Sequence, residues 1–362
     1  MQHTVTFRTE TMSDALCEPL ARLGARVYQD QPAFLPQMTN PAYFRWKHVE
    51  NPAGKSRLVN AYDGDRLVGS MAYQQRTFLC RGRPVAAAVL TNLMLDPEHQ
   101  DFLVFMGLAQ SLRRAPEFFP TFILPNEQST ILHEKALKLP LVTPLTLFLF
   151  PLRPGNLVQR LFKTPKPLFD GLGWLFCRMA LLTCPAPAGW SFCSAPRHPD
   201  DPESLIQAHD QRETVTGIRD AAFRSWRHGS GNPVWHYRTW YLYRHTELLG
   251  LVVTRRTRYQ GLDGLFIIDC ILDADLSGPA LRYLRGQLLR LGMREGCEVI
   301  LGMVNGSSPS AMKMVAWPFL RVPATLLPLP IVLRRARGKD DAAWDAQLWQ
   351  TAFITLADLD IL

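Results

Sequence analysis

The sequence predicts a mixed α/β protein that is built from two tandem copies of one domain. Residues 121–135 (TFILPNEQSTILHEK) are typical of a short strand, a turn at Asn126 and a helix that begins near Ser129. Residues 298–315 repeat this order, with a strand that ends at Asn305. Asn305 follows Asn126 by 179 positions in a chain of 362 residues, as expected for a duplication.

Other pairs of residues repeat at nearly the same spacing. Trp46 and Trp226 are 180 positions apart. Two Asn-Pro pairs and two glycines are each 181 positions apart, namely Asn51-Pro52 and Asn232-Pro233, and Gly69 and Gly250. Matching landmarks in one order and at one spacing are most simply explained by a duplicated domain.

Length and composition fit this division. Hydrophobic residues make up 47% of the chain and charged residues 20%, which is enough apolar area for two cores. We predict an N-terminal domain at residues 1–152, a proline-containing connection at 153–186 and a C-terminal domain at 187–338. A tail at 339–362 is expected to pack on a sheet edge, because a free apolar edge would invite aggregation.

The elements of the first half follow from alternating apolar runs, which predict strands, and from apolar spacings of three or four, which predict helices. In chain order we expect a strand at 4–9, a helix at 14–28, an aromatic turn region at 41–54, a hairpin at 57–62 and 67–73, strands at 77–80 and 85–95, a helix at 102–114, a strand and a helix at 121–138, and a closing strand at 145–152.

The second half follows the same plan. We expect a helix at 202–212, an aromatic turn region at 223–233, a hairpin at 240–258, a strand at 264–272, a helix at 279–295, a strand at 299–304 with its Asn turn and helix, and a strand at 331–335. The tail contains one more strand-like run, TAFITL.

Composition also narrows the class of protein. The N-terminus lacks an apolar signal core, and the apolar stretch at 168–184 is broken by Asp170 and Arg178, so we expect a cytoplasmic protein without a membrane span. The seven cysteines lack metal-ligand spacing and are expected to be reduced thiols, with no metal. The net charge of +8 favours an anionic partner such as a phosphorylated cofactor or an acidic carrier protein over nucleic acid, or simply gives a basic surface.

This order of elements resembles the GCN5-related N-acetyltransferase (GNAT) fold in tandem. Family members often show the pattern Asn-x-x-(Ala/Ser)-x-x-Leu-Tyr-Glu-Lys, and this chain matches it at Asn126, Ser129, Leu132, Glu134 and Lys135, with His133 in place of Tyr. The resemblance implies that Asn126 and Ser129, and Asn305 in the second copy, contact the pantetheine arm of coenzyme A. It also implies that His133 protonates the departing thiolate. The alternatives are a helix cap for Asn126 and a surface side chain for His133.

The family's phosphate-binding loop, (Arg/Gln)-x-x-Gly-x-(Gly/Ala), is only partly matched. Gln100 fits its first position, whereas Leu103 and Phe105 occupy its glycine positions. Three interpretations follow: the donor is an acyl carrier protein, the loop binds phosphate in a changed geometry, or both sites are inactive. Met312 stands at the Tyr position of the second copy, so the first half is predicted to be the active one.

Four further residues are candidates for the acceptor side of the reaction. Asp269 lies within an apolar strand, where a carboxylate must be paired or must face a cleft, and is a candidate base or one side of an ion pair. Tyr43, Trp46 and Trp226 are expected to line an acceptor pocket or to fill a core.

The sequence therefore predicts an N- or O-acyltransferase. Its donor would be an acyl-CoA or acyl carrier protein thioester, and its acceptor an amine or hydroxyl of a sugar or metabolite, a small molecule in either case. An inactive tandem binding module is the alternative. An aminoacyl-transfer ligase that draws on transfer RNA ranks last, because the helical arm usual in such ligases is not found.

Overall fold

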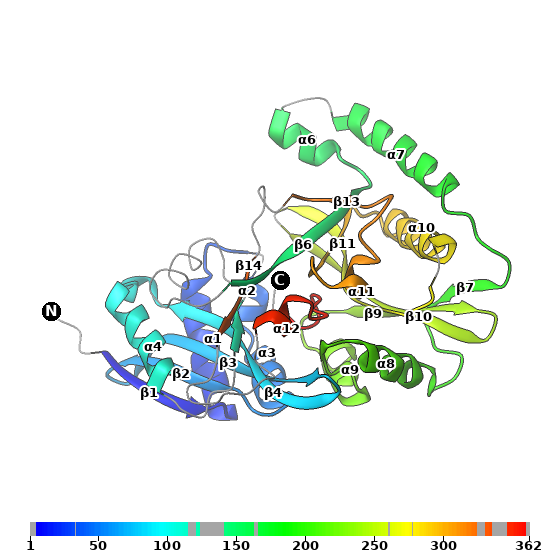
Figure 1. The fold of residues 1–362 in the computed structure, drawn as a ribbon. Helices are drawn as coiled ribbons and strands as arrows, with labels where there is room; N and C mark the ends of the chain where they lie inside the picture. Colours follow the sequence, from blue (N-terminus) through cyan, green and yellow to red (C-terminus); the bar gives the residue numbers. More distant parts are fainter. Residues whose placement is uncertain are drawn as a thin grey trace.

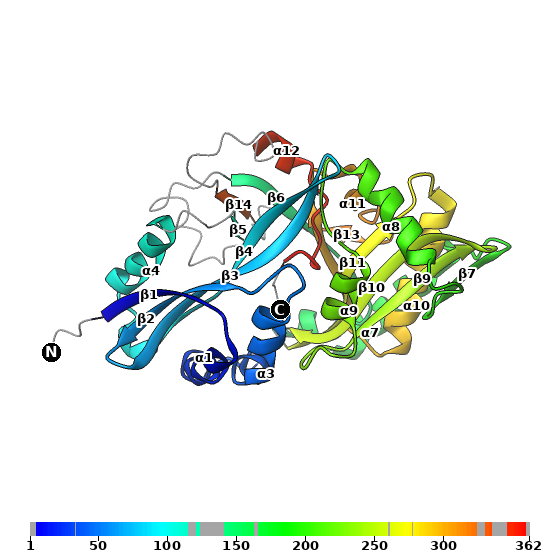
Figure 2. The ribbon, with the colours of Figure 1, turned by 90° about the horizontal axis from the view of Figure 1, so that it is seen from below.

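The computed structural model describes residues 5–32, 34–114, 121–123, 141–162, 166–259, 261–276, 278–323, 330–334 and 346–359. Their strands form one mixed system in the order β1-β2-β3-β4-β5-β14-β6-β12-β11-β10-β9-β7, with β8 beside β3 and β13 beside β6. Figures 1 and 2 show the two halves side by side, with β6 running between them.

The first half is an antiparallel meander to which a parallel strand is added. Its strands are β1 (Val5–Thr11), β2 (Arg57–Asp63), β3 (Arg66–Cys80), β4 (Arg83–Leu95) and the parallel β5 (Thr121–Ile123). Its helices are α1 (Asp14–Val27), α2 (Leu35–Met38), α3 (Pro41–Phe44), the π-helix Arg45–Val49, the 3₁₀-helix Pro97–His99 and α4 (Phe102–Arg114). Leu20 and Leu23 of α1 are buried at the spacing predicted from the sequence.

The second half repeats this arrangement. Its strands are β7 (Trp190–Cys193), β8 (Val215–Gly217), β9 (Tyr237–Arg244), β10 (Glu247–Tyr259), β11 (Leu262–Leu272), the parallel β12 (Val299–Asn305), β13 (Leu320–Arg321) and β14 (Pro330–Arg334). Its helices are α8 (Asp201–Arg212), α9 (Ala221–His228), α10 (Gly278–Arg294), α11 (Pro309–Met312) and α12 (Ala346–Gln350). The predicted fold class, a mixed α/β protein with two tandem domains of one fold, is confirmed.

The two halves exchange strands. β6 (Leu141–Pro151) was expected to close the first sheet, but it pairs antiparallel with β12 of the second half along seven residues, from Leu145 opposite Asn305 to Pro151 opposite Val299. In return, β14 from the second half lies between β5 and β6. Each half therefore needs the other to complete its sheet, so the strand at 145–152 does not close the first domain alone.

The repeated tryptophans meet at the junction of the two halves. Trp46 Nε1 donates a hydrogen bond to the carbonyl oxygen of Trp226 (2.9 Å), and Trp226 Nε1 donates to the carbonyl oxygen of Trp46 (2.8 Å). The rings stack with centroids 5.1 Å apart. Two residues separated by 180 positions thus form a reciprocal pair, as expected for copies related by a pseudo-twofold axis.

The connection at 153–186 contains two helices that were not predicted. They are α6 (Gly155–Phe162) and α7 (Lys166–Leu182), and both lie on the outside of the second half in Figure 1. Gly173, Cys177 and Ala180 form the buried face of α7. None of the helices in the described ranges is both long enough and apolar enough to cross a bilayer. All seven cysteines are thiols, as predicted, and six of them are buried.

Candidate active site

The parallel strands of the second half separate toward their carboxyl ends. β11 and β12 are paired from Gly264 opposite Val299 to Ile267 opposite Gly302. At the next residue, Ile268, the pairing of β11 with β10 also shifts register, which marks a β-bulge. Beyond these residues β11 and β12 are no longer paired with each other. We call the space between their unpaired ends the split.

The C-terminal tail fills this split. The Asn305 amide of β12 donates to the Ile354 carbonyl oxygen (3.0 Å), and the Ala357 amide donates to the Ile268 carbonyl oxygen of β11 (2.9 Å). Thr355 forms a bridge with Val304. The tail covers free strand edges, as a strand-like segment should, but these are inner edges of the split rather than an outer edge of the sheet.

A buried guanidinium holds the tail in place. Arg219 Nε lies 2.7 Å from Asp269 Oδ2, and one of its terminal nitrogens lies 2.6 Å from Asp358 Oδ2 of the tail. The Thr355 hydroxyl donates to Asp269 Oδ1 (2.9 Å), and the Thr355 amide donates to Asp358 Oδ2 (3.0 Å). Asp269 is thus in the ion pair that was the alternative to a catalytic base.

The pKa values of the two carboxyl groups of this cluster shift in opposite directions. Burial alone would raise the pKa of Asp269, but the Arg219 guanidinium and the hydrogen bond from Thr355 hold that pKa below its ordinary value. Burial raises the pKa of Asp358, and the same guanidinium only partly offsets this effect. Asp269 is therefore a weak base in this arrangement, and Asp358 is the carboxyl that takes up a proton first.

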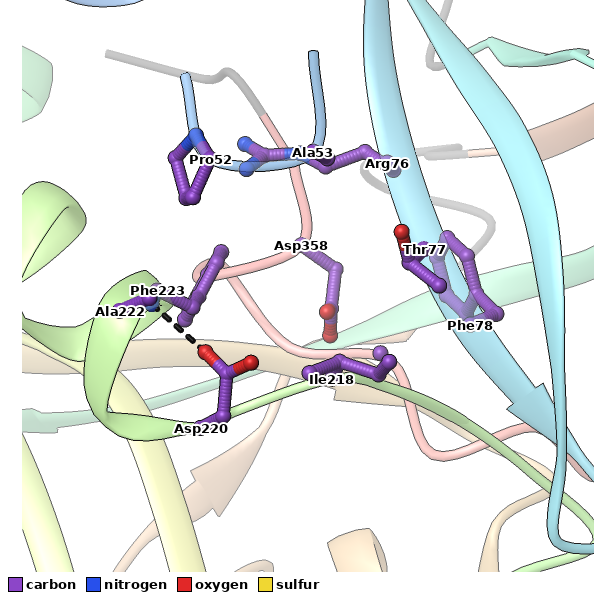
Figure 3. A pocket seen from close by; sticks show the side chains of 11 residues that line it. Pro52, Ala53, Arg76, Thr77, Phe78, Ile218, Asp220, Ala222, Phe223 and Asp358 are labelled. Carbon is purple, nitrogen blue, oxygen red and sulfur yellow. Dashed lines mark hydrogen bonds between the residues drawn. The ribbon is translucent and has the colours of Figure 1, made fainter. Parts of the chain in front are cut away.

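A small cavity lies between the halves beside this cluster (Figure 3). This interdomain cavity has a volume of about 130 Å³. Residues of β3 in the first half line it, together with five residues of the second half, namely Gly217, Ile218, Asp220, Ala222 and Phe223. The Asp358 side chain points into it in Figure 3. Gly217 allows this approach, since a Cβ atom there would lie 2.1 Å from Asp358 Oδ1.

A second cavity lies within the second half. This α9 cavity has a volume of about 340 Å³. Its floor is one face of three neighbouring strands, at Thr239 and Tyr241 of β9, Leu251 and Val253 of β10, and Asp269 and Ile271 of β11. Helix α9 contributes His228, whose Nε2 has no hydrogen-bond partner among the described residues. Burial lowers the pKa of His228 to about 3, so its ring is neutral and can accept a hydrogen bond near pH 7.

The corresponding parallel pair of the first half is β4 and β5. The described part of this parallel pair is short, with Ala88 opposite Thr121 and Val89 opposite Phe122, and β4 continues to Leu95. A shift in the β3–β4 register lies beside Asn92, which has a positive φ of 50°. In each copy, the longer strand of the parallel pair therefore has a bulge beyond its described pairing, a similarity between the two copies.

Asn92 anchors a buried polar cluster at this bulge. Lys47 is fully buried, and its ammonium donates to the Tyr43 hydroxyl (3.0 Å), to Thr91 Oγ1 (2.9 Å) and to Asn92 Oδ1 (2.5 Å). These three oxygens match the three N–H donors of an ammonium. His48 Nε2 also lies 3.2 Å from Asn92 Oδ1. No pattern in the sequence points to Lys47, because aromatic turn residues surround it.

The loop before α4 fits a pyrophosphate poorly. Asp101 Oδ1 accepts from the Leu103 amide (2.9 Å), and Asp96 Oδ1 accepts from the Glu98 amide (3.2 Å), so carboxylates of the chain occupy amides that a phosphate would need. Gln100 is exposed in this loop. Asp96 also pairs with Arg26 (2.6 Å) and Arg66 (2.9 Å), and although burial would raise its pKa, these hydrogen bonds lower it.

The other predicted site residues fall in three groups. Asn126, Ser129 and His133 lie outside the described residues. Tyr43, Trp46 and Trp226 are buried in one hydrophobic core shared by both halves, and neither the interdomain cavity nor the α9 cavity is lined by them. Asn305 is fully buried, and its side-chain amide donates to the carbonyl oxygens of Gln350 (2.9 Å) and Ala352 (2.7 Å), which fixes the start of the tail.

Acidification is expected to destabilise the protein through His209. Its ring nitrogens are buried without a hydrogen-bond partner in the described structure, and its ring packs edge-on against Phe353 of the tail, with centroids 4.4 Å apart. Burial, helped by the positive charge of Arg219, lowers the pKa of His209 to about 3. Between pH about 6.5, the pKa in the unfolded state, and pH about 3, the pKa in the folded state, only the unfolded state binds the proton. The free energy of unfolding therefore decreases as the pH is lowered.

From about pH 7 to about pH 5, this effect should remove about 2 kcal/mol from the free energy of unfolding. Urea titrations at both pH values measure it, and His209→Leu should lose this part of the pH dependence. His198→Leu, at an exposed histidine, is the control. An unchanged pH dependence in His209→Leu would contradict the assignment.

Comparisons with known proteins agree with this architecture. No protein-family model matches the sequence, and neither does any curated protein sequence. Among solved structures, N-myristoyltransferase of Saccharomyces cerevisiae, with bound myristoyl-CoA and inhibitors, is similar over 100% of this chain and 87% of its own, with a TM-score of 0.59 and 13% identity.

Two bacterial proteins are similar to about the same degree. A GCN5-related N-acetyltransferase of Anabaena variabilis ATCC 29413 matches with a TM-score of 0.58 and 12% identity over 91% of this chain and 73% of its own. A probable N-acyltransferase of Enterococcus faecalis V583 matches with a TM-score of 0.56 and 10% identity over 92% and 73%. The chain therefore has the tandem GNAT fold that the order of elements predicted.

Proposed function

We propose that the protein is an acyltransferase whose thioester donor binds in the first half. The observation that carries this proposal is that a segment of the chain itself occupies the corresponding place in the second copy. In the second copy, the split between β11 and β12 is filled by the tail, which bonds to both strands. The donor would then enter between β4 and β5, and the similar N-myristoyltransferase, which binds myristoyl-CoA, supports a thioester donor.

The reaction needs an acceptor that attacks the thioester, side chains that hold the pantetheine arm, and an acid that protonates the departing thiolate. The nitrogen or oxygen of the acceptor attacks the thioester carbonyl carbon, the new C–N or C–O bond forms, and the C–S bond breaks. We assign Asn126 and Ser129 to the pantetheine arm, because they match the family pattern. We assign His133 to protonation of the departing thiolate, because it stands at the Tyr position of that pattern and an imidazolium can donate a proton there. The acceptor's proton leaves to a base or to water.

The α9 cavity is the candidate acceptor site. Asp269 and His228 both line it, but the pKa of each is low, so each is better suited to accept a hydrogen bond from an ammonium or hydroxyl than to remove its proton. The proposed acceptor is thus a small molecule with an amine or a hydroxyl. Tyr43, Trp46 and Trp226 would act on it only through the packing that joins the halves.

The loop before α4 favours a carrier-bound donor over coenzyme A. Its amides at Glu98 and Leu103 already bond to carboxylates, which disfavours the pyrophosphate of coenzyme A. An acyl carrier protein presents one phosphate, and its acidic surface suits a chain of net charge +8. We place the protein in the cytoplasm, since its cysteines are thiols and such donors are made there.

Replacing His133 is expected to slow acyl transfer. The protein is incubated with acyl-CoA and acyl carrier protein donors and a panel of amines and alcohols, and released thiol is followed by a colorimetric reagent. Loss of a general acid in His133→Ala should lower kcat by about 100-fold. Asn126→Ala should mainly raise the KM of the donor.

Met312→Ala is the matched control, because Met312 holds the position of His133 in the second copy. It should keep its activity. Full activity of both first-half variants would remove the site assignment. Binding of phosphopantetheine without turnover would instead favour an inactive binding module, and salt-sensitive binding of transfer RNA would favour an aminoacyl-transfer ligase.

A further inference from the structure

One face of α7 carries a stripe of exposed apolar side chains. Of the ten large apolar residues that are most exposed in the described structure, six belong to this helix, with exposed fractions between 50% and 83%. Five of them recur at spacings of four and three, which places them on one face, namely Leu168, Leu172, Leu175, Met179 and Leu182. The stripe is about 21 Å long.

The stripe lies on an outer ridge of the molecule. The opposite face of α7, with Gly173, Cys177 and Ala180, is buried, and Cys177 and Ala180 belong to the core of the second half. In Figure 1 this helix runs along the outside, beyond α10. Trp317, which is 47% exposed and packs against Phe176 of α7, extends the apolar surface.

Exposed basic residues lie on α7 and close to it. Lys166 and Arg178 of α7 and Arg153 just before α6 are exposed. The guanidinium of Arg178 lies over the ring of Trp174, 5.0 Å from its centroid. Asp170 is the only carboxylate in residues 153–186, and it accepts a hydrogen bond from the Gly155 amide (2.9 Å).

We infer that this face of α7 docks on the surface of an anionic lipid bilayer. A straight apolar ridge that carries Trp and is flanked by basic residues lies in the plane of a membrane, with its apolar side chains about 5–10 Å deep and its cations at the lipid phosphates. A second copy of this chain is a poorer partner, since the contact would bring together two surfaces that both carry Lys166, Arg178 and Arg153.

Vesicle co-sedimentation of the full chain tests this inference. One set of vesicles contains equal parts of phosphatidylcholine and phosphatidylglycerol, and the other contains phosphatidylcholine alone. The protein should bind the anionic set, and high salt should weaken binding. Changing Lys166 and Arg178 to Gln should weaken it by about 25-fold, since each basic residue near a charged surface contributes about 1 kcal/mol.

Changing Leu172, Leu175 and Met179 together to Gln should abolish sedimentation. These side chains are exposed, so the fold is expected to persist, and circular dichroism checks this. Leu103→Gln, at an exposed leucine on α4 of the other half, is the matched control and should still sediment. Docking and acyl transfer are separable, because the triple variant leaves the first half unchanged and should keep its turnover of water-soluble donors.

Three results would overturn the inference. The first is equal binding of the wild type and the triple variant to anionic vesicles, and the second is no binding of the wild type to them. The third is a dimer in analytical ultracentrifugation that the triple variant converts to monomer, which would show that a second copy covers the ridge.

Discussion

Replacing Arg219 by methionine is expected to lower the free energy of unfolding by about 3–5 kcal/mol. The guanidinium is 1% exposed and lies between Asp269 and Asp358, which are also buried. Without it, two carboxylates remain in a dry environment with no counter-charge, and one or both must bind a proton or leave the core. Since Asp358 belongs to the tail, the least costly response is release of residues 353–359 from the split.

Two measurements on Arg219→Met test the loss of stability and the release of the tail. Urea titration gives the loss of stability, and hydrogen exchange at the Ala357 and Asn305 amides, which bond across the split, reports release of the tail. Arg224→Met is the control: Arg224 pairs with Glu203, which is 48% exposed, so its loss should cost less than about 1 kcal/mol.

Charge and packing can be separated in the same cluster. Adding Asp269→Asn and Asp358→Asn to Arg219→Met removes the two unpaired charges and should restore part of the stability. If Arg219→Met alone is as stable as the control, the ion pairs do not hold the tail. If exchange at Ala357 is unchanged in an otherwise destabilised variant, the tail is fixed by its apolar contacts instead.

The fold could be predicted from the sequence to a large extent because duplication leaves local marks. The Asn turns, the hairpins and the spacing of Trp46 and Trp226 depend on neighbouring residues or on a simple offset. The exchange of β6 and β14 could not be predicted, because an apolar strand pattern specifies which face is buried and not which strand lies beside it. The same limit applies to the tail, whose run TAFITL reads as a strand without naming its partners.

The site could be predicted less well, because its side chains come from distant parts of the chain. A carboxylate within the apolar strand of Asp269 indicated that this side chain has a partner, but not which one. The partner, Arg219, is 50 positions away in the sequence, and Arg219 also pairs with Asp358, which is 139 positions away from it. Asn305 shows the opposite problem. It fits the family pattern by position, yet its amide is committed to the backbone of the tail. A motif that is repeated by duplication can keep its residue while its role changes.

Replacing Trp226 by alanine is expected to cost about 3–5 kcal/mol and to loosen the junction of the two halves. The side chain is 9% exposed, stacks on Trp46 and donates one of the two reciprocal hydrogen bonds. Trp226→Phe keeps an aromatic ring but has no N–H donor, so the Trp46 carbonyl oxygen loses its hydrogen bond. Relative to a conservative change at the surface, this variant should lower the free energy of unfolding by about 1–2 kcal/mol more. Trp174→Ala, at an exposed tryptophan, is the control and should stay within about 0.5 kcal/mol of wild type.

The pairing itself is tested by a double-mutant cycle in urea. Because Trp46 and Trp226 contact each other, the loss in the double alanine variant should be smaller than the sum of the two single losses by about 1 kcal/mol or more. Additive losses would mean that each ring is held by its own half. The exchanged strands should keep wild-type unfolding in one transition, whereas removal of the tryptophan pair should allow the two halves to unfold at different urea concentrations. A single transition in the double variant would assign their coupling to β6 and β14 alone, and the duplicated tryptophans would then stabilise the junction without coupling its two sides.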